Sequence, residues 1–73
     1  MDASRKRQMA ELDVKRAGLE TQASELEKRA GPLREDGAEG DRKSFLLSEA
    51  RVLREDARDL ARKWADLAEE DRS

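Results

Sequence analysis

Carboxylates gather in one short glycine-rich stretch of the chain, where they could act as ligands for a hard cation. The acids in this stretch are Glu35, Asp36, Glu39 and Asp41. Carboxylate oxygens are the ligands that Mg²⁺ and Ca²⁺ prefer in proteins. The spacing of these acids does not match an EF-hand loop, and a solvated, charged turn accounts for them without any ion. The sequence therefore predicts no metal site and no cofactor.

Residues for other kinds of catalysis are missing. The chain has no histidine and no cysteine, which removes the commonest general base, the commonest metal ligands, thiolate nucleophiles and disulfides. It has no glycine-rich phosphate loop after a strand and no nucleophile paired with a base. We therefore expect a protein that is not an enzyme.

Composition restricts the partners of the chain. The 73 residues are 47% charged, with 16 basic side chains interspersed among 18 acidic ones. Such a balance argues against nucleic acid or an acidic membrane surface as the partner. No apolar run approaches the roughly 18 residues of a membrane span, and residues 1–9 lack the hydrophobic core of a signal peptide. We expect a cytoplasmic protein with a protein partner and no membrane contact.

Two heptad stripes organise the few apolar residues. When the chain is folded back on itself, the stripes oppose one leucine to one alanine in four consecutive layers, which are Ala30/Leu46, Leu26/Ala50, Ala23/Leu53 and Leu19/Ala57. Leu12/Trp64 and Met9/Leu67 continue the series towards the open end. This pattern predicts an all-α fold, a two-helix antiparallel coiled-coil hairpin. Because such a chain buries little apolar area, we expect a second chain to complete a four-helix bundle.

Local signals place the ends of the two helices. Ser4 is a suitable N-cap, and good helix formers continue to Ala30, so the first helix is expected over residues 4–30. The turn is expected over residues 31–40, which hold Pro32 and three of the four glycines. Asp41 or Ser44 then caps a second helix over residues 41–70. The chain is thus one domain, residues 1–73.

Charged residues beside the stripe provide a second indication of the register. Two attractive pairs are expected near the turn, Arg29 with Glu49 and Glu20 with Arg54, whereas Lys15 meets Lys63 near the open end. Exposed pairs of this kind contribute a few tenths of a kcal/mol each, so they influence register more than stability.

The second helix carries more apolar residues than one partner helix requires. Phe45, Leu47 and Val52 lie beside its stripe. They either pack the turn or form a surface for a partner, and we favour the partner surface. Trp64 is expected in the bundle core rather than as a ligand platform, but it would stay half exposed in a monomer. All four are candidate partner-binding residues.

Arg16 occupies a core position opposite Leu60. Its guanidinium can reach past Leu60 to solvent, or it can receive an acidic group from a second subunit. The function that these features indicate is a non-enzymatic interaction or assembly module. It would self-associate, most simply as a dimer, or bind a helical partner.

The turn also contains the sequence Gly31-Pro32-Leu33-Arg34-Glu35-Asp36-Gly37. This segment resembles the tip signature of bacterial Gre-type transcript cleavage factors, G-D-L-[KR]-E-N-[AG], and Glu49-Ala50-Arg51 is similar to their returning helix. The resemblance implies an antiparallel coiled coil that enters the secondary channel of RNA polymerase and holds a catalytic Mg²⁺ with tip carboxylates. Glu35 matches one acid of the family, and Asp36 lies beside it. Pro32 replaces the other acid, and Glu39 replaces an aromatic residue.

Looser similarities cover the helices. The chain resembles the hairpin arm of seryl-tRNA synthetases, and it resembles spectrin-type helix pairs through Leu60, Trp64 and Leu67. It also looks like small type III secretion co-chaperones through Phe45-Leu46, Ala50-Arg51 and Leu53. The alternative functions are therefore a polymerase-channel regulator and a small co-chaperone subunit of a secretion system.

Overall fold

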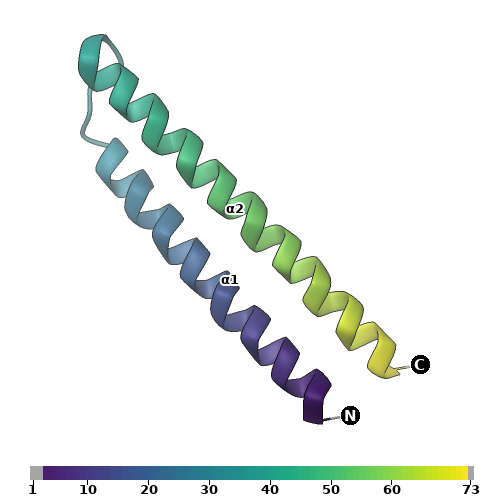
Figure 1. The fold of residues 1–73 in the computed structure, drawn as a ribbon. Helices are drawn as coiled ribbons and strands as arrows, with labels where there is room; N and C mark the ends of the chain where they lie inside the picture. Colours follow the sequence, from purple (N-terminus) through teal and green to yellow (C-terminus); the bar gives the residue numbers. More distant parts are fainter. Residues whose placement is uncertain (1–2, 73) are drawn as a thin grey trace.

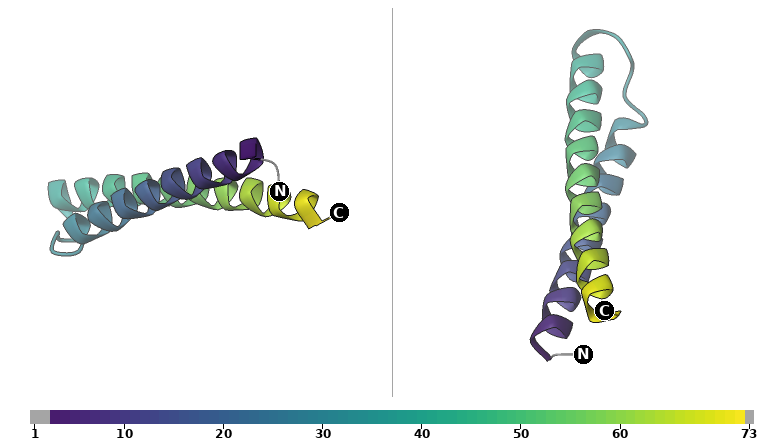
Figure 2. Two further views of the ribbon diagram at one scale, coloured as in Figure 1. Left: turned by 90° about the horizontal axis from the view of Figure 1, so that it is seen from below. Right: turned by 90° about the vertical axis from the view of Figure 1, so that its right-hand side faces the viewer.

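The computed structural model describes residues 3–72, which form two α-helices (Figure 1). α1 spans Ala3–Ala30 and α2 spans Gly37–Arg72. The helices pack against each other along their length, and the described residues form no strand. Both views in Figure 2 show the helices side by side and crossing at a shallow angle. The predicted all-α helical hairpin is confirmed.

Ion pairs between residues far apart in sequence show that the two helices run in opposite directions. Arg5 pairs with Glu70 at the open end, at 3.5 Å between Nη2 and Oε2. Arg54 pairs with Glu27 further along, at 2.6 Å between Nη2 and Oε1. The separation in sequence therefore shrinks towards the turn, as a hairpin requires.

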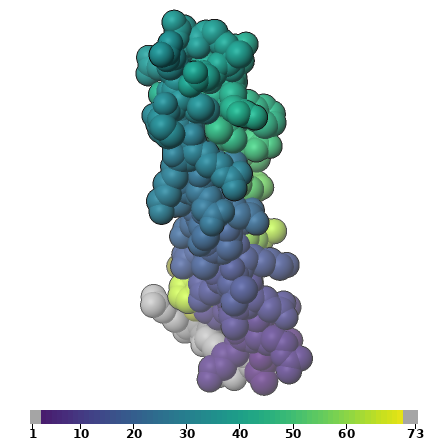
Figure 3. Space-filling view, turned by 90° about the vertical axis from the view of Figure 1, so that its left-hand side faces the viewer, coloured from purple at the N-terminus to yellow at the C-terminus, as the bar shows by residue number. Residues whose placement is uncertain are grey.

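The molecule is a thin rod. It measures 54 × 15 × 12 Å, and its radius of gyration is 16.6 Å. A compact domain of this length would have a radius of gyration of about 11 Å. Figure 3 shows the rod with α1 facing the viewer, the turn and the start of α2 at the upper end, and only edges of the rest of α2 visible behind α1. Such a shape leaves a large share of each helix in contact with solvent.

Small residues form the centre of the helix–helix contact. The buried apolar residues are Met9, Ala23, Ala30, Ala50 and Ala57. Each belongs to the predicted stripe, so the heptad pattern identified the residues at the contact. Alanine side chains allow the two backbones to approach closely, and the leucines opposite them then fill the space at the edge of the contact.

α1 ends where the sequence predicted. The amide of Gly31 still donates to the carbonyl of Glu27 at 3.0 Å, and the amide of Leu33 donates to the carbonyl of Ala30 at 3.1 Å. Pro32, between them, has no N–H to donate and disfavours helical geometry at Gly31. Lys28 and Arg29 occupy the last turn, where positive charge is favourable beside the helix dipole.

α2 begins at Gly37, not near residue 41 as the sequence predicted. The amide of Gly40 donates to the carbonyl of Asp36 at 3.0 Å, so Asp36 occupies the N-cap position in place of Asp41 or Ser44. Gly37 follows with a φ of 68°, which favours glycine. Oε1 of Glu39 accepts a hydrogen bond from the amide of Arg34 at 3.3 Å, tying the loop to this first turn.

Candidate interaction surface

The leucines of the stripe lie on one side of the helix–helix contact and stay partly exposed. We call this side the leucine face; its seven residues are Leu12, Leu19, Leu26, Leu46, Leu53, Leu60 and Leu67. None of them is buried, whereas the alanines opposite them have exposed fractions of 0 to 3%. A row of partly exposed leucines at helical spacing is typical of a surface that another helix covers.

A groove on the leucine face lies near the turn, and we call it the upper groove. Its volume is about 660 Å³. Its apolar lining is Leu26 of α1 with Phe45, Val52 and Leu53 of α2. Its polar lining is Gln22, Glu25, Arg29, Ser48 and Glu49. Phe45 is 62% exposed and Val52 is 55% exposed, so this groove brings together two of the large apolar side chains that the hairpin leaves uncovered.

A second groove lies on the leucine face near the open end, and we call it the lower groove. Its volume is about 390 Å³, and it is lined by Gln8, Glu11, Leu12, Lys15, Lys63, Asp66 and Leu67. Lys15 and Lys63 therefore line the same groove, as the predicted like-charge contact requires. Arg29 and Glu49 likewise share the upper groove, although they form no ion pair with each other.

The structure groups only two of the five candidate partner-binding residues. Phe45 and Val52 line the upper groove together, because they are two helical turns apart. Leu47 is 42% exposed and lies two turns before Arg54, so it shares the opposite flank with Arg54. Trp64 is 36% exposed and lines neither groove.

Arg16 also lies away from the two grooves. Its Nη2 pairs with Oδ1 of Asp13 on the same helix at 3.4 Å, and its side chain is 41% exposed. It lines a shallow depression with Ala57 and Ala61 on the flank opposite the leucine face. The guanidinium thus leaves the helix–helix contact and reaches solvent.

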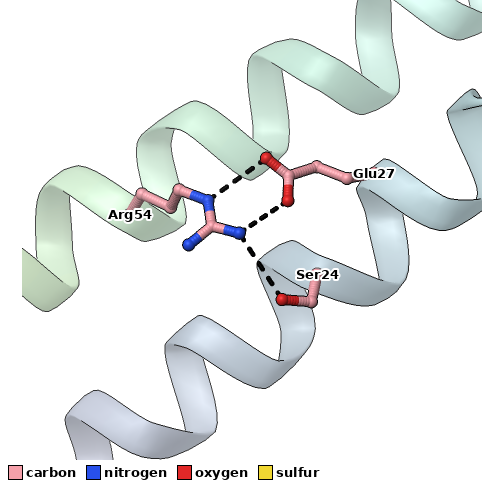
Figure 4. A network of polar contacts seen from close by, with 3 residues as sticks. All are labelled: Ser24, Glu27 and Arg54. Atoms are coloured by element: carbon pink, nitrogen blue, oxygen red, sulfur yellow. Dashed lines mark hydrogen bonds and ion pairs between the residues drawn. The ribbon is translucent and has the colours of Figure 1, made fainter.

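The opposite flank carries a polar network that joins the two helices (Figure 4). Arg54 donates from Nε to Oε2 of Glu27 at 3.2 Å and from Nη2 to Oε1 at 2.6 Å. Its Nη2 also donates to Oγ of Ser24 at 3.4 Å. The prediction that Glu20 pairs with Arg54 is wrong. Glu20 and Glu27 are one heptad apart, and Arg54 binds Glu27, the acid nearer the turn. Glu20 contributes only through its charge.

This network shifts the protonation of both partners. The hydrogen bonds from Arg54 lower the pKa of Glu27 below its ordinary value of 4.5. Partial desolvation opposes this shift, and the charge of Arg54 adds to it. The same pair raises the pKa of Arg54, mainly through the hydrogen bonds to Glu27. Glu27 is therefore ionised at neutral pH and fastens the helices on the side away from the leucine face.

The tip acids do not converge on one point. The side chain of Glu35 is 91% exposed, and its Oε1 lies 3.7 Å from Nζ of Lys43. Asp36 is exposed and occupies the N-cap position of α2. Among the described residues, no three acidic, histidine or cysteine side chains are grouped so that they could hold a metal ion.

Val14 is a large exposed residue outside the heptad stripe. It is 74% exposed and lies on the outer side of α1 with Arg7, Ala10 and Lys15. An isolated apolar residue outside the stripe carries no periodic signal, and single exposed apolar residues are common on protein surfaces.

Neither helix, over the described residues, has an apolar stretch long enough to cross a bilayer. Comparison with protein-family models, curated proteins and solved structures finds no match to this chain.

Proposed function

We propose that the protein is a non-enzymatic protein–protein interaction module, whose leucine face is covered by helices of another chain. The observation that carries this proposal is the incomplete core. Among the described residues the hairpin buries four alanines and one methionine, and every leucine of its stripe remains partly exposed. Hydrophobic burial is the main favourable term in folding and association, so covering these leucines stabilises both.

The surface area of the chain supports the same proposal. The hairpin exposes 5736 Å². A compact monomeric protein of 8.3 kDa would expose roughly 4,600 Å². The excess of about 1,100 Å² is comparable with the roughly 800 Å² that each partner buries in a standard protein–protein interface. One interface over the leucine face therefore suffices to bring the chain to the exposure of a compact protein.

A charge placed in the upper groove tests this proposal. Val52→Asp should abolish binding, because a partner that covers this position would have to strip water from the new carboxylate without offering it a hydrogen bond. Val14→Asp is the matched control: the same change at a valine on the outer side of α1 should leave binding intact. Binding is read as self-association by sedimentation equilibrium and as proteins retained from a native lysate by immobilised chain.

The proposal is contradicted only if both readouts, self-association and retention of proteins from the lysate, give a negative result. If wild-type protein sediments as a stable monomer, and if Val52→Asp and Val14→Asp retain the same proteins from the lysate as wild type, the leucine face is not a binding surface. Circular dichroism at the same concentrations establishes that each variant keeps its helices.

A further inference from the structure

We propose that a second copy of this chain covers the leucine face, lying antiparallel to the first, with the two-fold axis level with Leu19 and perpendicular to the helices. This inference rests on the proposed function and specifies its partner. In this arrangement α1 faces α1 of the second copy and α2 faces α2, so the tip of each hairpin lies beside the open end of the other. The contact is isologous, as closed dimers require.

The positions of the leucines suit this axis. In the register predicted from the heptad stripes, Leu19 of α1 lies level with Ala57 of α2. Rotation about that level superimposes the leucine positions of each helix on those of its own copy to within about one residue. The resulting pairs between copies are Leu19 with Leu19, Leu26 with Leu12, Leu53 with Leu60, and Leu46 with Leu67.

The same rotation brings the upper groove of one copy onto the lower groove of the other. Phe45, which has the largest exposed apolar side chain of the upper groove, then meets Leu67 of the second copy. Val52 meets Leu60. The apolar side chains left uncovered by one hairpin are thus placed on the leucines left uncovered by the other, over an area that matches the excess exposure of the chain.

Both grooves carry acidic and basic side chains, which this orientation brings to the same levels. Glu25 lies level with Lys15 and Glu11 of the second copy, and Glu49 lies level with its Lys63 and Asp66. Arg29 meets Glu11 of the second copy. Symmetry doubles each contact, so the lysines that repel each other within one hairpin gain acidic neighbours from the other.

The alternative orientation, with both tips at the same end, staggers the leucines of the two copies by three to four residues, although it brings Arg29 level with Glu49 of the second copy. There α1 faces α2 of the second copy at the same level. Lys15 of each copy then approaches Lys63 of the other, which adds to the like-charge contact already present inside the hairpin. Like charges across an interface disfavour the orientation that juxtaposes them. Of the two orientations, the antiparallel one alone brings the leucines of the two copies level to within about one residue, and this favours the antiparallel dimer.

The antiparallel dimer also has a like-charge contact at the two-fold axis itself. Asp56 lies beside the two-fold axis, so it approaches Asp56 of the second copy. Asp56→Asn removes this repulsion and should tighten the dimer roughly two- to fivefold, the range expected of one exposed charge contact. In the orientation with tips together, Asp56 approaches no copy of itself and the change should have little effect. Glu55→Gln, one residue away and outside the leucine face, is the control.

A distance measurement between the two tips tests the orientation directly. The chain has no cysteine, so Ala38→Cys introduces one exposed site at the tip for a spin label. Electron–electron dipolar spectroscopy on the labelled full chain should give a distance between copies close to the 54 Å length of the rod. A distance under about 25 Å, roughly two helix diameters, would show the tips together and overturn the orientation.

Failure of this inference is separable from failure of the proposed function. A short distance between tips, or no gain from Asp56→Asn, leaves the leucine face as an interface and rejects its antiparallel arrangement. A monomer in sedimentation equilibrium at high micromolar concentration rejects the second copy as the partner. The proposed function then still stands if Val52→Asp, and not Val14→Asp, fails to retain an identified protein from the lysate.

Discussion

Arg54 of α2 donates two hydrogen bonds to Glu27 of α1, from Nε to Oε2 at 3.2 Å and from Nη2 to Oε1 at 2.6 Å. Both side chains are 42% exposed, so solvent screens the pair. Its two-pronged geometry nevertheless holds one register between the helices, because a shift of α2 by one turn would separate the two groups. The pair lies on the flank away from the leucine face, so a chain docked on that face leaves it in place.

The Glu27–Arg54 pair predicts a pH dependence of stability. The pKa of Glu27 is lower in the folded chain than its ordinary value of 4.5. A lowered pKa means that the folded state binds the proton less well than the unfolded state, so the pair stabilises the fold above the unfolded pKa. That contribution disappears as the pH falls below 4.5 and through the folded pKa.

Glu27→Gln isolates this contribution. The wild type should exceed the variant in unfolding free energy at pH 7, and the difference should disappear at acidic pH and shrink in 1 M salt. Urea denaturation across the pH range measures it. Glu55→Gln, the same change at an exposed residue on the outer side of α2, should show no such difference. A Glu27→Gln difference that stays constant with pH would contradict the role of the ionised pair.

The sequence predicted which apolar residues lie at the contact between the helices better than it predicted which charged residues pair beside that contact. Heptad spacing identifies which residues meet, because a helix repeats its faces every seven residues, and the structure buries those alanines. The same spacing makes Glu20 and Glu27 equivalent, so it could not tell which of them Arg54 would bind. The rotamer of a long arginine side chain decides that, and no periodic pattern records it.

The grouping of the candidate surface residues was only partly predictable. Phe45 and Val52 were identified as surplus apolar residues, and they do share a groove. Leu47 and Arg16 were also candidate partner-binding residues, but Arg16 lines the depression on the other flank. Leu47 lies two turns before Arg54 and so on that same flank. Excess hydrophobicity is visible in composition, whereas the side of the seam on which it lies depends on the geometry of the contact.

Gly40, in the first turn of α2, lies against the backbone of Glu35, and its replacement should destabilise the turn. A Cβ at this position would lie 2.6 Å from the carbonyl carbon of Glu35, which is backbone and cannot rotate away. Gly40→Ala should cost about 1–3 kcal/mol and move the start of α2 towards residue 41. Urea denaturation and the ellipticity at 222 nm measure the two effects.

Gly18→Ala is the matched control for Gly40→Ala. Nothing lies within 4 Å of a Cβ built at Gly18, in the interior of α1. The same change should therefore stabilise the chain by about 0.5–1 kcal/mol, through helix propensity. If both variants were stabilised equally, the close approach of Gly40 to Glu35 would not exist in solution.

The alanine contact predicts that larger side chains are not tolerated there. Ala23 has an exposed fraction of 0% and lies between the two backbones. Ala23→Leu should push the helices apart and cost about 1–3 kcal/mol. Ala10→Leu, at an exposed position of α1, should be neutral or slightly stabilising. Thermal unfolding of the two variants under one set of conditions compares them, and equal melting temperatures would contradict the close contact.

Glu35 separates function at the tip from function on the leucine face. Its side chain is 91% exposed, and its only ion pair among the described residues is the 3.7 Å contact with Lys43. Such a contact contributes little to stability. Glu35→Ala should therefore keep the fold, the self-association and the retained proteins of the wild type, whereas Val52→Asp should abolish binding.

The resemblance to transcript cleavage factors implies the reverse: Glu35→Ala would abolish an effect on transcript cleavage or pausing by RNA polymerase, and Val52→Asp would leave that effect intact. Transcript cleavage assays on stalled polymerase with both variants decide between them, because coordination of a cation at an exposed tip tolerates changes on a distant helix face, and helix packing tolerates the loss of a solvated carboxylate.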